Sequence, residues 1–164
     1  MRVKGKKFTY VQEFVRLPSG MRVRLEKVIH PGAVVLVPFL KPSLIVFIRQ
    51  YRATLKKYIY ELPAGTLESG ESRLACAKRE LAEETSYQAR RFMYKGFIYP
   101  VPGYSTEVIH IYAAYDLACA SAQKDDDELL EPVVLSRAQV QRMFREGKIV
   151  DGKTVCALTF CGVL

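Results

Sequence analysis

Three glutamates in the middle of the chain, Glu80, Glu83 and Glu84, have the spacing of residues that share one side of a helix. At about 100° per residue, Glu80 and Glu84 lie one turn apart and Glu83 lies beside them. Like charges at this spacing destabilise a helix by roughly 0.2–0.5 kcal/mol. Neighbouring cations such as Lys78 and Arg79 can offset the repulsion, and so can a bound divalent metal ion.

The ligand atoms that these glutamates offer are all oxygens. The two histidines, His30 and His110, stand far from them in sequence, and the chain has no Cys-x-x-Cys pair. Such a set favours a hard cation, Mg²⁺ or Mn²⁺, over zinc. Because Mg²⁺ commonly bridges carboxylates to a substrate phosphate, the pattern indicates phosphoryl chemistry. The alternative interpretation is a solvated helix face with a salt bridge between Arg79 and Glu83.

A helix that begins after Ser72 would position these glutamates. Serine is a favoured N-cap residue, and apolar or small residues then recur at helical spacing. They are Leu74, Ala77, Leu81 and Thr85. This stripe predicts that one side of the helix packs on a core while the other side presents the carboxylates.

Strand-like runs precede and follow this helix. Two of them, at 8–16 and 21–29, are joined by a Pro-Ser-Gly turn and predict an antiparallel hairpin. Further strands are expected at 33–38, 44–50, 58–62, 88–99 and 107–115, and two more helices after Ser136 and Asp151. Strands on both sides of a central helix predict a mixed α/β sandwich.

Length and charge narrow the class of protein. The chain has 164 residues, enough for one domain, and residues 1–60 hold 13 Lys and Arg against 2 Asp and Glu. This basic first third would suit a nucleic acid or a small polyanion.

No apolar run approaches the roughly 20 residues that span a bilayer, and no signal peptide is visible. We expect a soluble cytoplasmic protein with reduced cysteines, in which Cys76 is a small apolar filler.

The segment from Gly65 to Glu84 reads G-x5-E-x7-R-E-L-x-E-E. It resembles the Nudix box, the signature of hydrolases that cleave nucleoside diphosphates linked to another group. The resemblance implies an α/β/α sandwich in which a loop–helix–loop holds Mg²⁺ against a diphosphate. One position departs from the family pattern, since Ser86 stands where a glycine is usual. This change removes no metal ligand.

Shorter segments look like the ADP-ribose pyrophosphatase branch of that family: HPGAV at 30–34, IRQYR at 48–52, ELPAG at 61–65, and a Pro-Gly-x3-Glu motif at 102–107. They imply Mg²⁺-dependent cleavage of ADP-ribose to AMP and ribose 5-phosphate, with Mn²⁺ as a substitute. Another nucleoside diphosphate sugar or a dinucleotide is the alternative substrate. A silent nucleotide-binding or RNA-binding Nudix domain is the alternative class, although no dense run of basic residues favours nucleic acid.

The resemblance also assigns metal-binding roles. Glu80 and Glu84 would hold the metal ions, with Glu83 close by and the carbonyl of Ala64 as a backbone ligand. Arg79 would orient the glutamates by salt bridges.

The general base and the phosphate-binding residues come from other segments in this branch. The base would belong to the acidic loop 125–128, with Glu128 as the first choice and Asp126 as the second. Arg52 and Arg49 would grip a phosphate or the terminal ribose. Successive strand residues alternate sides, so only one of the two need face the site, and Arg52 is preferred.

The Pro-Gly loop would contribute Gly103 and Glu107 to substrate binding. Glu107 would bind ribose or order a metal-bound water, and a structural role for it is equally open. Purine stacking needs an aromatic platform, and the chain has no Trp. The candidates are Phe8, Tyr10, Phe14 and Tyr104. In relatives the N-terminal region exchanges between subunits, so we expect a homodimer built from a dimerisation region 1–30 and a Nudix domain 31–164.

Overall fold

A computed structural model of the chain describes residues 1–120 and 129–164. The acidic loop that contains Asp126 and Glu128 therefore lies outside the described residues. In chain order the elements are β1 (Arg2–Lys4), β2 (Thr9–Arg16), β3 (Arg22–Ile29), β4 (Ala33–Lys41), β5 (Leu44–Arg52), β6 (Lys57–Glu61), β7 (Ala64–Thr66), α1 (Arg73–Thr85), β8 (Tyr87–Ile98), β9 (Ile109–Cys119), β10 (Leu130–Ser136), α2 (Arg137–Arg145) and α3 (Gly152–Phe160).

The central sheet is mixed, as the sequence predicts. Its strands run in the order β10-β5-β4-β9-β8, with β6 added to β5 and β7 added to β4. β4 and β9 are parallel, and the other pairs are antiparallel. β4 lies in the middle of the sheet, and its residues from Ala33 to Phe39 are buried. A strand buried on both faces requires covering layers on each side.

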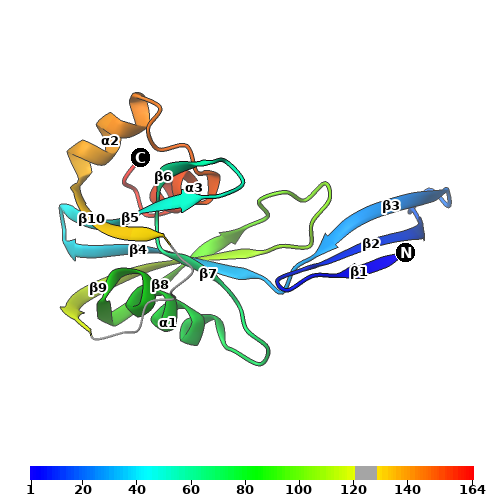
Figure 1. Cartoon of the computed structure of the whole chain (residues 1–164), viewed down its shortest axis with the longest axis horizontal. Helices are drawn as coiled ribbons and strands as arrows, with labels where there is room; N and C mark the ends of the chain where they lie inside the picture. Colours follow the sequence, from blue (N-terminus) through cyan, green and yellow to red (C-terminus); the bar gives the residue numbers. More distant parts are fainter. Residues whose placement is uncertain (121–128) are drawn as a thin grey trace.

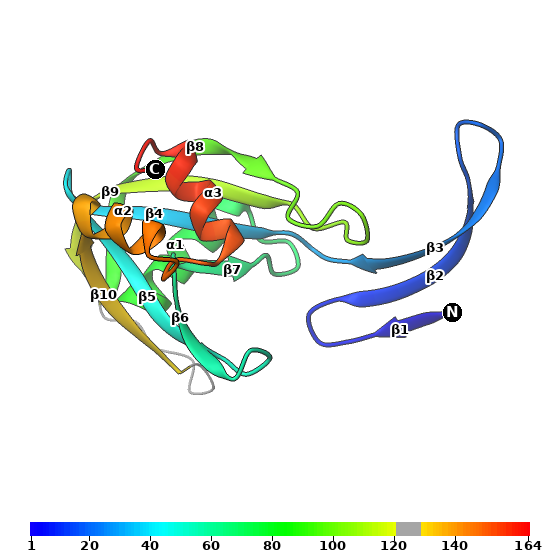
Figure 2. The same cartoon turned by 90° about the horizontal axis from the view of Figure 1, so that it is seen from above.

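Helices supply these layers, and alternate residues of β4 face one or the other. Val34 and Leu36 pack in a cluster with Leu81 of α1, whereas Val35 and Val37 belong to the cluster that includes residues of α2 and α3. The molecule is thus an α/β/α sandwich with α1 on one face and α2 and α3 on the other (Figures 1 and 2). The expected fold class is confirmed.

The first 29 residues form an arm that stands apart from the sandwich (Figures 1 and 2). β2 and β3 pair as the predicted hairpin, and β1 adds a third strand that the sequence pattern did not reveal. β3 continues into β4, and two backbone hydrogen bonds join Val28 to Tyr104 and Thr106. The arm exposes several apolar side chains: Val3, Phe8, Phe14, Leu17, Met21 and Ile29.

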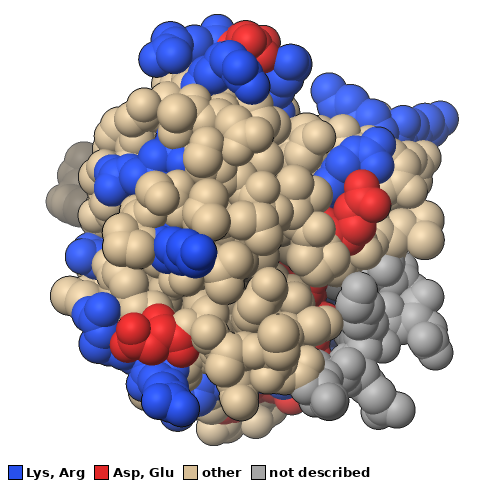
Figure 3. Space-filling view, turned by 90° about the vertical axis from the view of Figure 1, so that its left-hand side faces the viewer, with Lys and Arg blue, Asp and Glu red and all other residues tan. Residues whose placement is uncertain are grey.

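The end of the molecule opposite the arm carries separated groups of basic side chains, some beside acidic ones (Figure 3). On the face shown, this differs from the continuous basic stripe of a typical nucleic-acid-binding surface. Across the described parts of the chain, no helix has both the length and the apolar character needed to cross a membrane.

Candidate active site

The helix α1 begins and ends where the sequence indicates. The Ser72 side chain accepts a hydrogen bond from the Ala75 N–H, and the C-cap Ser86 has a left-handed backbone with φ of 58°. Ala77, Leu81 and Thr85 are buried as expected. Leu74, expected in the same stripe, is 41% exposed.

The last turn of α1 is tied to the strand end that precedes the helix in the chain. The Ala64 N–H donates to the Glu84 carboxylate, with 2.9 Å between nitrogen and oxygen. Glu84 is only 5% exposed. A buried carboxylate that accepts a backbone N–H is held in one position, and this bond places Glu84 beside Ala64.

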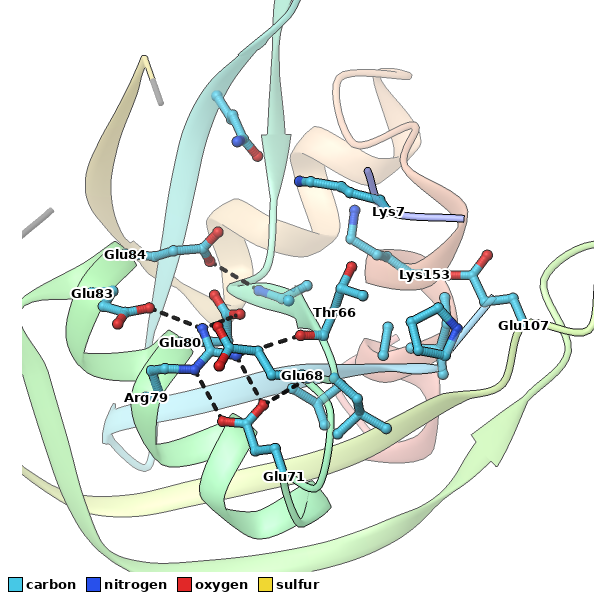
Figure 4. A pocket seen from close by; sticks show the side chains of 18 of the residues that line it. Lys7, Thr66, Glu68, Glu71, Arg79, Glu80, Glu83, Glu84, Glu107 and Lys153 are labelled. Atoms are coloured by element: carbon cyan, nitrogen blue, oxygen red, sulfur yellow. Dashed lines mark hydrogen bonds and ion pairs between the residues drawn. The ribbon is translucent and has the colours of Figure 1, made fainter. Parts of the chain in front are cut away.

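Arg79 gathers three further carboxylates of the loop and helix. Its Nε and Nη2 donate to Glu71 at 3.0 and 3.1 Å, and its Nη1 donates to Glu80 at 2.7 Å and to Glu83 at 3.0 Å. Figure 4 shows the Arg79 guanidinium between these side chains. The hydrogen bond from Arg79 lowers the pKa of Glu71, and the same bond raises the pKa of Arg79. The cation thus offsets the repulsion that the glutamate spacing creates.

Gly65 leaves the space that the Glu80 side chain occupies. A Cβ atom built on Gly65 would lie 1.7 Å from Oε1 of Glu80, closer than any real contact. The backbone of Gly65 has no positive φ, so the requirement for glycine here is one of space rather than of conformation.

Cys76 lies on the buried side of α1 and has no exposed surface. Its thiol donates weakly to the carbonyls of Gly65 and Thr66, and burial raises its pKa to about 12. Such a thiol stays protonated at neutral pH, in agreement with a packing role.

A cavity of about 980 Å³ opens beside these carboxylates. The acids of α1 and its preceding loop line one part of it. Cations from other elements also line it: Lys6 and Lys7 from the arm, Arg52 from β5 and Lys153 from α3. In Figure 4, Lys7 and Lys153 lie across from Glu83 and Glu84. An elongated polyanion can contact a metal-binding side and a cationic side of this cavity at once.

A NUDIX domain model matches residues 29–157, which is most of the chain. The chain belongs to the NUDIX family. It is 32% identical to an ADP-ribose pyrophosphatase of Bacillus subtilis, over 95% of this chain and 85% of that protein. It is also 37% identical to a methanol dehydrogenase activator of Bacillus methanolicus, over 89% of this chain and 80% of that protein.

One further relative and one solved structure are also similar to this chain. A GDP-mannose pyrophosphatase of Escherichia coli O1:K1 is 33% identical over 79% of this chain and 72% of its own. The crystal structure of an ADP compounds hydrolase superposes with a TM-score of 0.84, at 25% identity, covering 97% of this chain and 86% of that one. The chain is therefore a hydrolase of the Nudix family.

Nudix hydrolases generally use divalent metals, and the oxygen-only donor set of α1 suits a hard cation. Within the described residues, no three acidic, His or Cys side chains converge as a metal site. Glu80 and Glu83 contact Arg79, and Glu84 accepts the Ala64 N–H. A metal ion would compete with Arg79 for the same oxygens. The absence of a side chain at Gly65 lets the Glu80 carboxylate lie against the backbone next to Ala64, an arrangement that suits a metal site formed by these two residues.

Arg52 and Arg49 have separate surroundings, because Arg52 lines the cavity beside the α1 acids and Arg49 does not. Ile45 and Phe47 of β5 belong to the core cluster on the α2 and α3 face, so the alternation of the strand turns Arg52 towards the α1 face. Arg49, of opposite parity, pairs with Glu131 of β10 at 2.9 Å.

Arg52 is fixed by a buried acid. Its Nε and Nη2 donate to Glu61 at 2.5 and 2.6 Å, and Lys153 donates to the same carboxylate. Burial acts to raise the pKa of Glu61, but the hydrogen bond from Arg52 and the charge of Lys153 outweigh burial and lower it. Glu61 is thus held as an anion although it is 1% exposed.

Gln50 lines the cavity on the same face of β5 as Arg52 and is 4% exposed. Among the described residues, its Oε1 is the buried side-chain oxygen or nitrogen without a hydrogen-bond partner. An unsatisfied buried acceptor costs about 1–3 kcal/mol, so this atom is expected to have a partner when the cavity is filled.

The remaining candidate residues differ in whether they line the cavity. Glu107 lines the cavity, whereas Gly103 does not. The four aromatic candidates also lie outside the lining formed by the described residues: Phe8, Tyr10, Phe14 and Tyr104. Asp126 and Glu128 belong to the part of the chain that is not described.

Lys6, Lys7, Gln50 and Lys153 line the cavity without having been singled out by sequence reasoning. Gln50 carried a usable signal, because it stands two residues before Arg52 and must share its face of the strand. The lysines carried none, since the pairing of distant segments brings them to the site.

Proposed function

We propose that this chain hydrolyses the diphosphate linkage of ADP-ribose and releases AMP and ribose 5-phosphate. The observation that carries the proposal is the pairing of two features in one cavity. The acids of α1 lie in one part of the lining and the cations Arg52 and Lys153 lie in another. ADP-ribose pyrophosphatases of Bacillus subtilis and Mycobacterium tuberculosis, at 32% and 37% identity, support the choice of substrate.

Mg²⁺ is the proposed metal, with Mn²⁺ as a substitute. Glu80, Glu84 and the Ala64 carbonyl would hold it, with Glu83 close by. When bound, such a metal neutralises the diphosphate and lowers the pKa of a coordinated water. Arg79 orients the glutamates through the contacts described above.

In the proposed reaction a water oxygen attaches to one phosphorus as the bridging P–O bond breaks. Glu128, or alternatively Asp126, takes the proton that the water loses, a contribution of about 10²–10⁴ in rate. Arg52 holds a phosphate oxygen and Glu107 holds a ribose hydroxyl. Replacing Glu128 by Gln and Asp126 by Asn, one at a time, tests the base, because only loss of the true base removes the corresponding limb of the pH–rate profile.

A sugar nucleotide is the second candidate substrate, since the GDP-mannose pyrophosphatase relative is 33% identical. Turnover of ADP-ribose, GDP-mannose, NADH and diadenosine polyphosphates with Mg²⁺ ranks the candidates. We expect the largest kcat/KM with ADP-ribose, and no turnover in excess EDTA. Equal or faster turnover of GDP-mannose would overturn the choice of ADP-ribose, and turnover that persists in EDTA would overturn the metal mechanism.

We further propose that residues 1–30 act as a dimerisation region for a Nudix domain spanning 31–164. The support is the apolar surface of the arm, where Phe14 is 62% exposed. Sedimentation of the full chain should give a dimer, and Phe14→Glu should shift it towards monomer. The matched variant Leu55→Glu, at an exposed turn between β5 and β6, should leave the dimer intact. A monomeric full chain would contradict the proposal.

A further inference from the structure

One buried carboxylate organises two cations that lie far apart in the chain. Glu61 of β6 accepts both N–H groups of an Arg52 fork and the ammonium of Lys153 at the start of α3. Lys153 also contacts Asp151 at 3.0 Å, so two carboxylates balance the two cations. The group of two cations and two carboxylates has no net charge. Its capacity to bind an anionic ligand therefore depends on the N–H donors that the carboxylates leave unused.

Both cations keep N–H donors outside these pairs. Arg52 uses Nε and Nη2 for Glu61, which leaves its Nη1 outside this ion pair. Lys153 has three N–H bonds and two carboxylate partners. Both side chains line the cavity, and Figure 4 shows Lys153 reaching into it. These donors are suited to phosphate oxygens.

The unpartnered Gln50 acceptor belongs to a side chain that lines the same cavity. Gln50 and Arg52 are two residues apart on one face of β5, a spacing of about 6.6 Å. One phosphate group cannot satisfy both positions, because Gln50 Oε1 needs a donor and a phosphate dianion has none. A ligand with a phosphate and a nearby hydroxyl satisfies both.

We propose that Arg52, Lys153 and Gln50 form a subsite for a sugar phosphate, with Glu61 as the positioning residue that sets both cations. The subsite binds one phosphorylated sugar of the substrate, and in this respect the inference rests on the proposed function. The phosphate contacts Arg52 and Lys153, and a sugar hydroxyl donates to Gln50.

Binding of the separate phosphorylated products tests the subsite without turnover. Calorimetric titration with AMP, ribose 5-phosphate and mannose 1-phosphate compares the wild type with Lys153→Met and Gln50→Leu. We expect each variant to weaken the same ligand at least tenfold. The control Lys148→Met, on an exposed lysine that pairs with Glu146 outside the cavity, should change none of the affinities. Unchanged affinity for all three ligands in Lys153→Met would overturn the proposal.

Stability separates a binding role of Gln50 from a packing role. Removing an unsatisfied acceptor should leave the Tm of Gln50→Leu equal to or above that of the wild type while ligand affinity falls. A fall in Tm with retained affinity would assign Gln50 to packing and overturn its part of the subsite.

Glu61→Gln tests the positioning role through the split between KM and kcat. We expect Glu61→Gln to raise KM as much as Lys153→Met does, with kcat within about threefold of the wild type. The double variant with both substitutions should have a KM no higher than that of the more impaired single variant. Additive losses would refute positioning, and if Glu61→Gln does not fold, the two product-binding variants decide the subsite. A wild type that binds a sugar phosphate but does not cleave ADP-ribose would refute the proposed function and leave the subsite standing.

Discussion

The backbone N–H of Ala64 donates to the carboxylate of Glu84 across 2.9 Å, although the two residues are 20 positions apart in the chain. This bond closes the loop and the helix between them into one ring. Its two ends are the residues to which the family resemblance assigns metal binding. The relative position of the Ala64 carbonyl and the Glu84 side chain is therefore set by the fold before any ligand arrives.

Glu84→Gln should reduce kcat by at least about 10²-fold, because the neutral amide is a much weaker ligand for a hard cation. The amide oxygen can still accept the Ala64 N–H, so the Tm should change little. Steady-state kinetics and thermal unfolding measure the two effects. Glu146→Gln, an exposed acid at the end of α2, serves as the control and should keep full activity. Activity above half of the wild-type value in Glu84→Gln would remove α1 from the mechanism.

Gly65→Ala should impair catalysis without unfolding the protein. The new methyl group would overlap the Glu80 carboxylate, which must leave its position and its contact with Arg79. We expect a loss of at least about tenfold in kcat/KM, since small misplacements of catalytic groups are costly. Gly103→Ala is the matched control, because Gly103 does not line the cavity and a Cβ there meets nothing within 4 Å. If both variants were equally active, the space at Gly65 would have no role in catalysis.

Ser86→Gly should stabilise the protein. Ser86 caps α1 with φ of 58°, a conformation that costs an L-residue roughly 1–2 kcal/mol and glycine very little. A net gain of about 1 kcal/mol corresponds to a rise in Tm of about 2–4 °C for a chain of this size. Ser43→Gly, at a position without positive φ, should give no rise. A lower Tm for Ser86→Gly would show that the serine side chain has a compensating contact.

The contribution of Glu71 to stability should depend on pH. Its hydrogen bond from Arg79 lowers the Glu71 pKa below the usual 4.5. A group whose pKa is lower in the folded state stabilises the fold fully above its unfolded pKa and loses this effect as the pH falls through the folded value. The difference in Tm between wild type and Glu71→Gln should therefore be constant near neutral pH and shrink below about pH 4.5. A difference that does not change on acidification would argue against an ionised Glu71.

The sequence pattern was sufficient for the layers of the fold and for helix α1, because long periodic segments and capping residues such as Ser72 and Ser136 leave a clear signal. It was not sufficient for β1 and β7, which have only three residues each. A strand that short shows no period, and tertiary pairing alone defines it.

For the site, the spacing of Glu80, Glu83 and Glu84 indicated the chemistry, but it did not reveal that Arg79 contacts Glu71, eight residues earlier. That contact depends on the path of the loop before the helix. Lys153 illustrates the same limit, because only the docking of α3 brings it to Glu61, which is 92 residues away in the chain.

The cavity draws its acidic and its basic linings from separate pieces of the chain, since Lys6 and Lys7 belong to the arm and the glutamates to α1. Substitutions in the turn between β1 and β2 can therefore retune which anion is preferred while the hydrolytic apparatus stays untouched. Substitutions in this turn alone are thus a route by which the preferred nucleotide substrate changes during evolution. Libraries randomised at Lys6 and Lys7 are a direct way to alter the selectivity.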